Sequence, residues 1–267
     1  MRQVYKKPKT VKEQVEYLKQ NKKVVFNSIS EEDAEKILYE HCYINVITPY
    51  KHRFAEIDRS TGLPARDAKN NHIYNHDTEF NDYYKTYDNE RRKYPKIYKN
   101  IMMFETTFNS IVANEVLTTY GIDSFDSFMK FRDQLMINVS MMKLTEPLRD
   151  RMRDEINGFY NTMKRYDDIF IFMDRLSLSQ VITIYRCVDQ GVHDRIFQGL
   201  CNANVTFGYS SPGTFDDFLK RIVPIRNCIC HFNSLEILTN YYDIKTKQLR
   251  TITDRKKFQK VIAKLSK

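Results

Sequence analysis

Apolar residues recur three and four positions apart along most of the chain, which is the spacing that places them on one face of an α-helix. The longest such stripe runs through residues 96–120, and a second one follows residues 215–232. Shorter stretches with this spacing predict helices at 10–22, 31–40, 78–92, 125–135, 145–166, 168–176 and 179–188. Only 7 Gly and 7 Pro interrupt the chain, which argues against a strand-and-turn architecture. The pattern therefore predicts an all-α fold.

Polar residues and helix breakers mark several ends of these predicted helices. Ser30 stands three residues before Asp33, the spacing of a capping box, and Thr214 is a candidate N-cap for the later apolar helix. Pro95 is expected to separate two helices, and Gly121 is expected to end the longer one in a left-handed conformation.

Two stretches do not fit a single period. Residues 41–54, HCYINVITPYKHRF, are rich in Tyr, Ile and Val, so periodicity alone allows a strand as well as a helix. Residues 58–77 are polar, follow neither period and predict a long loop or insertion. The chain is accordingly divided into a helical N-terminal unit (1–57), that loop, a helical domain (78–244) and a basic C-terminal segment (245–267).

A polar cluster interrupts the late apolar helix. Arg226 and Asn227 are followed by His231, and the four-residue step from Asn227 to His231 places both on one helix face. A histidine near its ordinary pKa of about 6.5 can act as acid or base at neutral pH, and the arginine fork suits phosphate oxygens. Pro224 is expected to kink the helix just before the cluster. The same spacing also fits a satisfied core histidine beside a surface arginine.

The motif RNxxxH resembles the signature of HEPN domains, all-helical modules that include many metal-independent ribonucleases. Four further blocks occur in the order seen in Abi-like abortive-infection proteins of the AbiD/AbiF type: KKPKTVKEQVEYLKQ, CYINVITPYKHRF, IYKNIMMFETTF and IFIFMDRLSLSQVITIYRCV. The resemblance covers most of the chain and implies a helical bundle of HEPN type with a small helical N-terminal unit. It also favours the helical form of residues 41–54, with Pro49 as a bend.

The resemblance implies an endoribonuclease toxin of an anti-phage or toxin–antitoxin system, with Arg226, Asn227 and His231 as its catalytic residues. Each chain has one motif, so a homodimer would supply both an acid and a base. Glu105 of the first HEPN helix would orient Arg226, although Asn109 stands where the family often has a basic residue. The alternative is an RNA-binding HEPN module that does not cut. A version silenced by AMP transfer to a Tyr is disfavoured, because residues 232–233 are Phe and Asn.

The formal net charge of +9 is concentrated at the two ends of the chain. Residues 245–267 carry nine Lys or Arg against one Asp, and residues 1–25 carry eight against two Glu. Basic ends on a mildly acidic body predict contact with a polyanion such as RNA, although they would also aid solubility. The expected partners are substrate RNA and either a cognate antitoxin RNA or an antitoxin protein. The candidate RNA-binding residues are Lys6, Lys7, Lys9, Arg255, Lys256, Lys257 and Lys260.

No cofactor or metal is expected. His72 and His76 have the spacing of a helical ligand pair, but no carboxylate or Cys at ligand spacing accompanies them. No apolar run approaches the ~18 residues of a membrane span, and the N-terminus lacks the apolar part of a secretory signal. Five Cys without framework spacing suit a reducing compartment. The sequence thus predicts a cytoplasmic protein without membrane contact.

Overall fold

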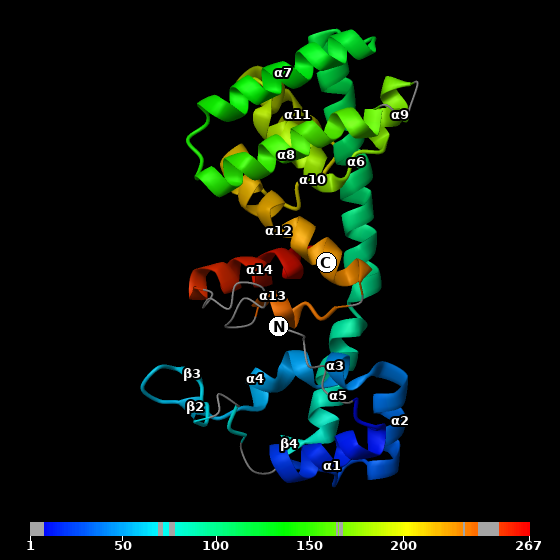
Figure 1. Ribbon diagram of the computed structural model, residues 1–267, viewed down its shortest axis with the longest axis vertical. Helices are drawn as coiled ribbons and strands as arrows, with labels where there is room; N and C mark the ends of the chain where they lie inside the picture. Colours follow the sequence, from blue (N-terminus) through cyan, green and yellow to red (C-terminus); the bar gives the residue numbers. More distant parts are fainter. Residues whose placement is uncertain are drawn as a thin grey trace, which may run out of the picture. The chain divides into compact units, whose positions relative to one another are not determined.

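The computed structural model describes residues 8–68, 72–74, 78–163, 165, 168–231, 233–239 and 251–267. Helices dominate this part of the chain, so the predicted all-α class is confirmed (Figure 1). The helices pack as two compact units, which are described separately. Unit 1 contains residues 1–95 and 227–266, and unit 2 contains residues 96–226. The two units group residues by their contacts in space, whereas the predicted boundaries at residues 57, 77 and 244 divide the chain by sequence. Those boundaries therefore stay predictions.

Unit 1 is built from short helices and two small pairs of strands. Its elements are α1 (Val11–Lys22), β1 (Val24–Val25), α2 (Glu31–His41), α3 (Tyr43–Val46), the 3₁₀ helix η1 (Thr48–Tyr50), α4 (Lys51–Phe54), β2 (Ile57–Asp58), β3 (Leu63–Pro64), β4 (Thr78–Glu79), α5 (Phe80–Arg91), α13 (Glu236–Thr239) and α14 (Ile252–Leu265). Its N-terminal helices share one apolar core, which includes Leu18, Leu38, Tyr50, Phe80 and Tyr83.

Local sequence signals account for most of the helix ends in unit 1. The Thr10 side chain accepts from the Glu13 amide while the Glu13 carboxylate accepts from the Thr10 amide, which forms a capping box at α1. Ser30 caps α2 through the Asp33 amide, as predicted. The ambiguous residues 41–54 are helical, and they are divided into α3, η1 and α4 around Pro49. The helical expectation is therefore confirmed, and Pro49 lies within the 3₁₀ helix between α3 and α4.

The segment predicted as a loop contains more pairing than its composition indicated. Strands β2 and β3 form an antiparallel pair, and single bridges join Ala55 to Tyr74 and Arg66 to His72. Strand β4 pairs in parallel with β1, so the predicted helical start at Thr78 is wrong and α5 begins at Phe80. Two-residue strands leave too short a pattern for periodicity to detect.

Unit 2 is a bundle around the long helix α6. Its helices are α6 (Tyr94–Tyr120), α7 (Phe125–Met141), α8 (Glu146–Met163), α9 (Ile169–Asp174), α10 (Leu178–Cys187), α11 (Gln190–Asn202) and α12 (Pro212–Cys230). Helices α6 and α12 begin in one unit and end in the other. Helix α7 packs against α8, and α10 packs against both (Figure 1).

Aromatic rings from α6 and α12 interlock in the core of unit 2. The ring of Phe104 lies 5.2 Å from that of Phe108 and 5.2 Å from that of Phe218, which it meets edge to face. Phe215 stacks on Phe218 at 5.5 Å and meets Tyr185 edge to face. These rings are fully buried, and they occupy the apolar stripes that the sequence predicted for both helices. The packing fixes how α12 lies against α6 within this unit.

Candidate functional site

The motif lies at the C-terminal end of α12. The helix begins at Pro212, a residue whose missing amide hydrogen suits the first helical position. Ser211 precedes it and its hydroxyl accepts from the Thr214 amide at 3.4 Å, so the predicted N-cap role of Thr214 is wrong. The helix continues past Pro224 to Cys230. The kink predicted at Pro224 stays a prediction.

Arg226 forms an ion pair with Glu105 of α6. The Nε atom of Arg226 lies 3.7 Å from Oε2 of Glu105, and the two side chains are 38% and 14% exposed. Both residues belong to unit 2. One turn further along α6, the side-chain oxygen of Asn109 is buried without a hydrogen-bond partner among the described residues. The ion pair brings the sequence-predicted Arg226 and Glu105 together, whereas the catalytic role of either residue stays a prediction.

Asn227 and His231 belong to unit 1 and are both exposed. His231 follows the last residue of α12, and its amide donates to the Asn227 carbonyl at 3.1 Å, as in a helix. The Asn233 amide donates to the Cys228 carbonyl at 2.8 Å, a bond that is typical of a helix C-terminus. The exposure of His231 disagrees with the core-histidine interpretation of the motif.

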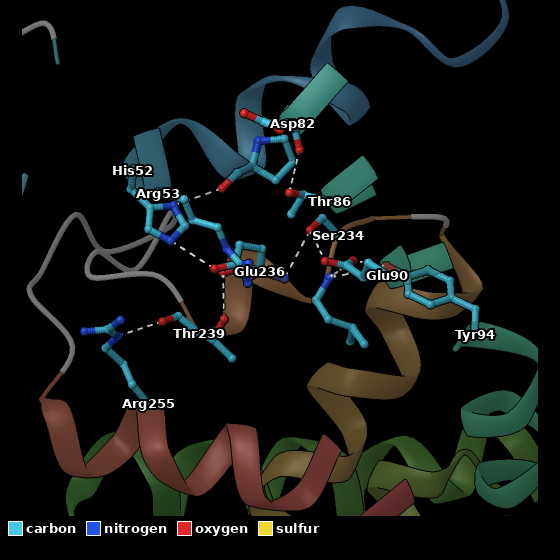
Figure 2. A network of polar contacts seen from close by, with 12 residues as sticks. His52, Arg53, Asp82, Thr86, Glu90, Tyr94, Ser234, Glu236, Thr239 and Arg255 are labelled. Atoms are coloured by element: carbon cyan, nitrogen blue, oxygen red, sulfur yellow. Dashed lines mark hydrogen bonds and ion pairs between the residues drawn. The ribbon is translucent and has the colours of Figure 1, made fainter. Parts of the chain in front are cut away.

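A polar network holds the residues that follow His231 against α5 and the start of α6 (Figure 2). Glu90 accepts from the Ser234 hydroxyl at 3.0 Å and from the Leu235 amide at 2.8 Å. The Tyr94 hydroxyl lies 2.5 Å from Glu90 and 2.6 Å from the carbonyl oxygen of Asn233, and its one hydrogen can serve one of them at a time. Burial, followed by the charge of Glu90, raises the pKa of Tyr94.

Glu236 is the centre of a second, buried part of this network. Its carboxylate lies 2.9 Å from Nε2 of His52 and 2.5 Å from Nη2 of Arg53, while Nδ1 of His52 lies 3.1 Å from the Pro49 carbonyl oxygen (Figure 2). Burial alone would raise the pKa of Glu236, but the hydrogen bonds and charges of His52 and Arg53 outweigh it and lower that pKa. Both nitrogens of His52 therefore face acceptor oxygens. The network ties the segment after the motif to η1 and α4.

Sequence reasoning missed this network. Glu236 is 183 positions from Arg53, and Glu90 is 145 positions from Leu235, so no short spacing connects them. The one available signal is local: the polar Ser234 and Glu236 stand on either side of the apolar Leu235, with the apolar Leu238 two residues after Glu236, and all four are buried. A buried charge requires a partner, but the sequence does not tell which one.

The candidate RNA-binding residues have different surroundings. Lys9 is exposed, and its ammonium lies 3.9 Å from the centre of the Tyr17 ring. On α14, Arg255 donates to the Thr239 carbonyl at 2.7 Å and therefore has a structural contact within unit 1. Lys256 and Lys260 are exposed, whereas Lys257 is partly buried. Lys6 and Lys7 lie outside the described residues.

The described residues contain no group of three or more His, Cys, Asp or Glu side chains placed to hold a metal ion. His76, one of the two histidines considered from the sequence, lies outside the described residues. His72 pairs across a single bridge with Arg66 rather than lying on a helix. Within the same described part of the chain, no helix has the length and apolar character needed to cross a bilayer.

Comparison with known proteins adds the family. No curated protein and no solved structure shows significant similarity to the chain. A family model described as "Abi-like protein" matches residues 36–235. The matched region begins in α2, includes all of α3 to α12 and ends after the motif, so it contains Glu105, Arg226 and His231. The match covers most of the chain, and the protein therefore belongs to the family of Abi-like proteins.

Proposed function

We propose that this protein is a metal-independent endoribonuclease that acts as a toxin in abortive infection, with Arg226, Asn227 and His231 as its catalytic residues. The observation that carries the proposal is the Abi-like family match over a region that includes the complete RNxxxH motif. Two further observations support it. His231 is exposed, as a residue that transfers protons to a large substrate has to be, and the ion pair with Glu105 gives Arg226 a defined position on α12.

The proposed reaction uses a nucleophile that RNA itself supplies. A base removes the proton of the 2′-hydroxyl, O2′ attacks the adjacent phosphorus, and the bond from phosphorus to O5′ breaks as an acid protonates O5′. The products end in a 2′,3′-cyclic phosphate and a 5′-hydroxyl. His231 is the residue for proton transfer, since an imidazole changes its charge near neutral pH. The Arg226 guanidinium stabilises the extra negative charge on the phosphate oxygens.

The remaining residues would position these two groups. Glu105 would orient the guanidinium of Arg226 through their ion pair. Asn227 would hold the imidazole or a phosphate oxygen through its amide. One chain supplies a single histidine, so a homodimer that pairs two motifs would provide the acid and the base together. The alternative function is an RNA-binding module, in which the motif would bind RNA without cleaving it.

Cleavage by the purified protein is expected to continue in excess EDTA and to require the 2′-hydroxyl. The test substrate is an RNA oligonucleotide, and the control is the same sequence with 2′-O-methyl groups, which cannot form the attacking oxyanion. Mass spectrometry of the products should find cyclic phosphate ends. Inhibition by EDTA that a defined metal ion reverses would count against this mechanism, and so would cleavage of the methylated control.

RNA affinity is expected to depend steeply on salt, because each phosphate that a lysine neutralises releases counterions. The double variant Lys256→Gln, Lys260→Gln removes two exposed charges of α14 and leaves the contact of Arg255 with Thr239 in place. If both lysines contact phosphates, the slope of log affinity against log salt should become shallower by about 1.4 for single-stranded RNA. Fluorescence anisotropy of a labelled RNA measures the slope.

The matched control for this salt experiment is Lys36→Gln, Lys85→Gln, which removes two exposed lysines from α2 and α5 in the acidic middle of the chain. It should leave the slope unchanged. Equal slopes for the parent and the α14 variant would exclude α14 as the RNA-binding surface and would favour the interpretation that its charges only aid solubility.

A further inference from the structure

Unit 1 contains a cluster of lysines and tyrosines that the proposed cleavage chemistry does not use. The ammonium of Lys22, at the end of α1, lies 4.8 Å from the centre of the Tyr74 ring and 5.6 Å from that of Tyr17. The ammonium of Lys51, at the start of α4, lies 5.2 Å from the centre of the Tyr43 ring. Lys22 is only 8% exposed, which is unusual for a lysine.

Among the described residues, nothing balances the positive charge of this cluster. Within the part of the chain that the structure describes, no carboxylate lies within ion-pair distance of Lys22 or Lys51, and the contacts of both ammonium groups are with tyrosine rings. Burial and then the nearby charge of Lys22 lower the pKa of Lys51 to about 8. His72 lies in the same positive field: burial, followed by Arg66, His52, Lys51 and Lys22, lowers its pKa to about 4.

Hydrogen-bonding groups of the cluster are also unsatisfied. The hydroxyls of Tyr43 and Tyr74 and Nδ1 of His72 are buried and have no hydrogen-bond partner among the described residues. Tyr74 as a whole is 4% exposed. A buried phenol without an acceptor costs free energy, and so does a buried ammonium without an anion. One bound anion with several oxygens would correct both deficits.

We propose that Lys22, Lys51, Tyr43 and Tyr74 form a binding site for a phosphate group. Phosphate fits this set better than a carboxylate, because it has more acceptor oxygens and carries close to two negative charges near neutral pH. Lysine is a common phosphate ligand that acts as a point charge, and the two phenol hydroxyls add hydrogen-bond donors. The site uses no residue of the RNxxxH motif, so it is independent of the proposed ribonuclease activity.

Binding of inorganic phosphate to the full chain tests the proposal, with ionic strength held constant by chloride. Calorimetric titration should give saturable binding to the parent, and Lys51→Met and Lys22→Met should each weaken it at least tenfold. Tyr74→Phe keeps the ring and removes only the unsatisfied hydroxyl, so it should weaken phosphate binding severalfold without unfolding the chain. The control Lys12→Met removes an exposed charge from the same helix as Lys22 and should bind as the parent does.

Stability without phosphate separates a binding site from simple cation–π packing. If the charge of Lys51 is buried without an anion when phosphate is absent, Lys51→Met should be at least as stable as the parent at pH 7. Because the pKa of Lys51 in the folded chain is below its ordinary 10.5, the parent should gain stability relative to this variant as pH rises from about 8 to 10.5. Thermal unfolding measures both. A less stable Lys51→Met protein, or unchanged phosphate affinity in Lys51→Met and Tyr74→Phe, would overturn the proposal.

The source of the phosphate is distinguished by comparing uridine monophosphate with one oligoribonucleotide that carries either a 5′-phosphate or a 5′-hydroxyl. Tighter binding of the phosphorylated oligonucleotide, lost in Tyr74→Phe, assigns the site to an RNA end. Equal affinity for inorganic phosphate and the nucleotide, also lost in Tyr74→Phe, assigns it to a small phosphorylated ligand. Either result supports the site.

Discussion

Expression of the parent chain in a bacterial host is expected to arrest growth, and the His231→Ala variant is expected to grow as an empty-vector control does. The physical reason is the loss of the proton-transfer group, an effect of about 10²–10⁴-fold on the rate of the chemical step. His231 is exposed at the end of α12, so its replacement removes little packing and should leave the fold intact. Growth curves and RNA cleavage by the purified proteins measure the effect.

Arg226 provides a second test of the same chemistry. Replacement by Lys keeps a positive charge but loses the planar fork, so we expect a loss of about 10²–10³-fold, as when one transition-state donor is removed. Glu105→Gln keeps Arg226 and removes its anionic partner, so its cleavage rate should lie between those of the parent and Arg226→Lys.

A matched control is His41→Asn, which changes another histidine of the chain outside the motif. This variant should remain toxic. If both His231→Ala and Arg226→Lys arrest growth as strongly as the parent while circular dichroism shows intact helices, the proposed ribonuclease is excluded. The phosphate site in unit 1 would be unaffected by that result, because it is measured by binding.

Glu236→Gln is expected to lower the free energy of unfolding by about 3 kcal/mol, the scale for removing one partner of a buried ion pair. The Glu236 side chain is 10% exposed, and His52, which it contacts, is 7% exposed. The amide keeps the size of the side chain but not its charge, so His52 and Arg53 lose the anion that they share. Urea unfolding followed by circular dichroism measures the difference between the variant and the parent.

The dependence of this difference on pH has a defined sign. The pKa of Glu236 is lower in the folded chain than its ordinary value of 4.5. Its charge therefore contributes stability that is complete above about pH 4.5 and is lost as pH falls through the folded-state pKa. The gap between the parent and Glu236→Gln should be widest near pH 7 and should shrink in acid.

The control for Glu236 is Glu31→Gln, which removes the partner of Lys19 at a surface where the two side chains are 47% and 42% exposed. Exposed pairs contribute at most about 1 kcal/mol, so this variant should be nearly as stable as the parent. Similar losses for the two glutamates would contradict a buried role for Glu236.

Much of the fold was predictable because its signals are local. The capping of α1 and α2 and the apolar stripe of α6 follow from residues within a few positions of one another. Gly121 ends α6 with φ +58° and has the left-handed conformation predicted for it. The split of residues 41–54 around Pro49 required the family resemblance, since a short run of Tyr, Ile and Val fits two periods.

Other features depend on partners that are distant in sequence. Helix α11 was not predicted, and residues 252–265 were recognised by charge alone although they fold as α14 and bury Phe258, Val261 and Leu265. The polar contacts of Glu90 and Glu236 require the end of the chain to return to its beginning. For the candidate site, spacing identified Arg226 and His231, and the resemblance added Glu105. The unsatisfied groups around Lys22 became visible only in three dimensions.

The division of the chain also determines the order in which it can fold during synthesis. Residues 96–226 form unit 2 and are continuous, so they can pack as soon as they leave the ribosome. Unit 1 must wait for residues 227–266, because Glu90, His52 and Arg53 have their partners there. At about 5–20 residues per second, the delay between the two parts of unit 1 is on the order of ten seconds. The residues that follow His231 are thus held in place only after unit 2 has been synthesised, and fragments from translation that stalls before residue 227 would lack these contacts.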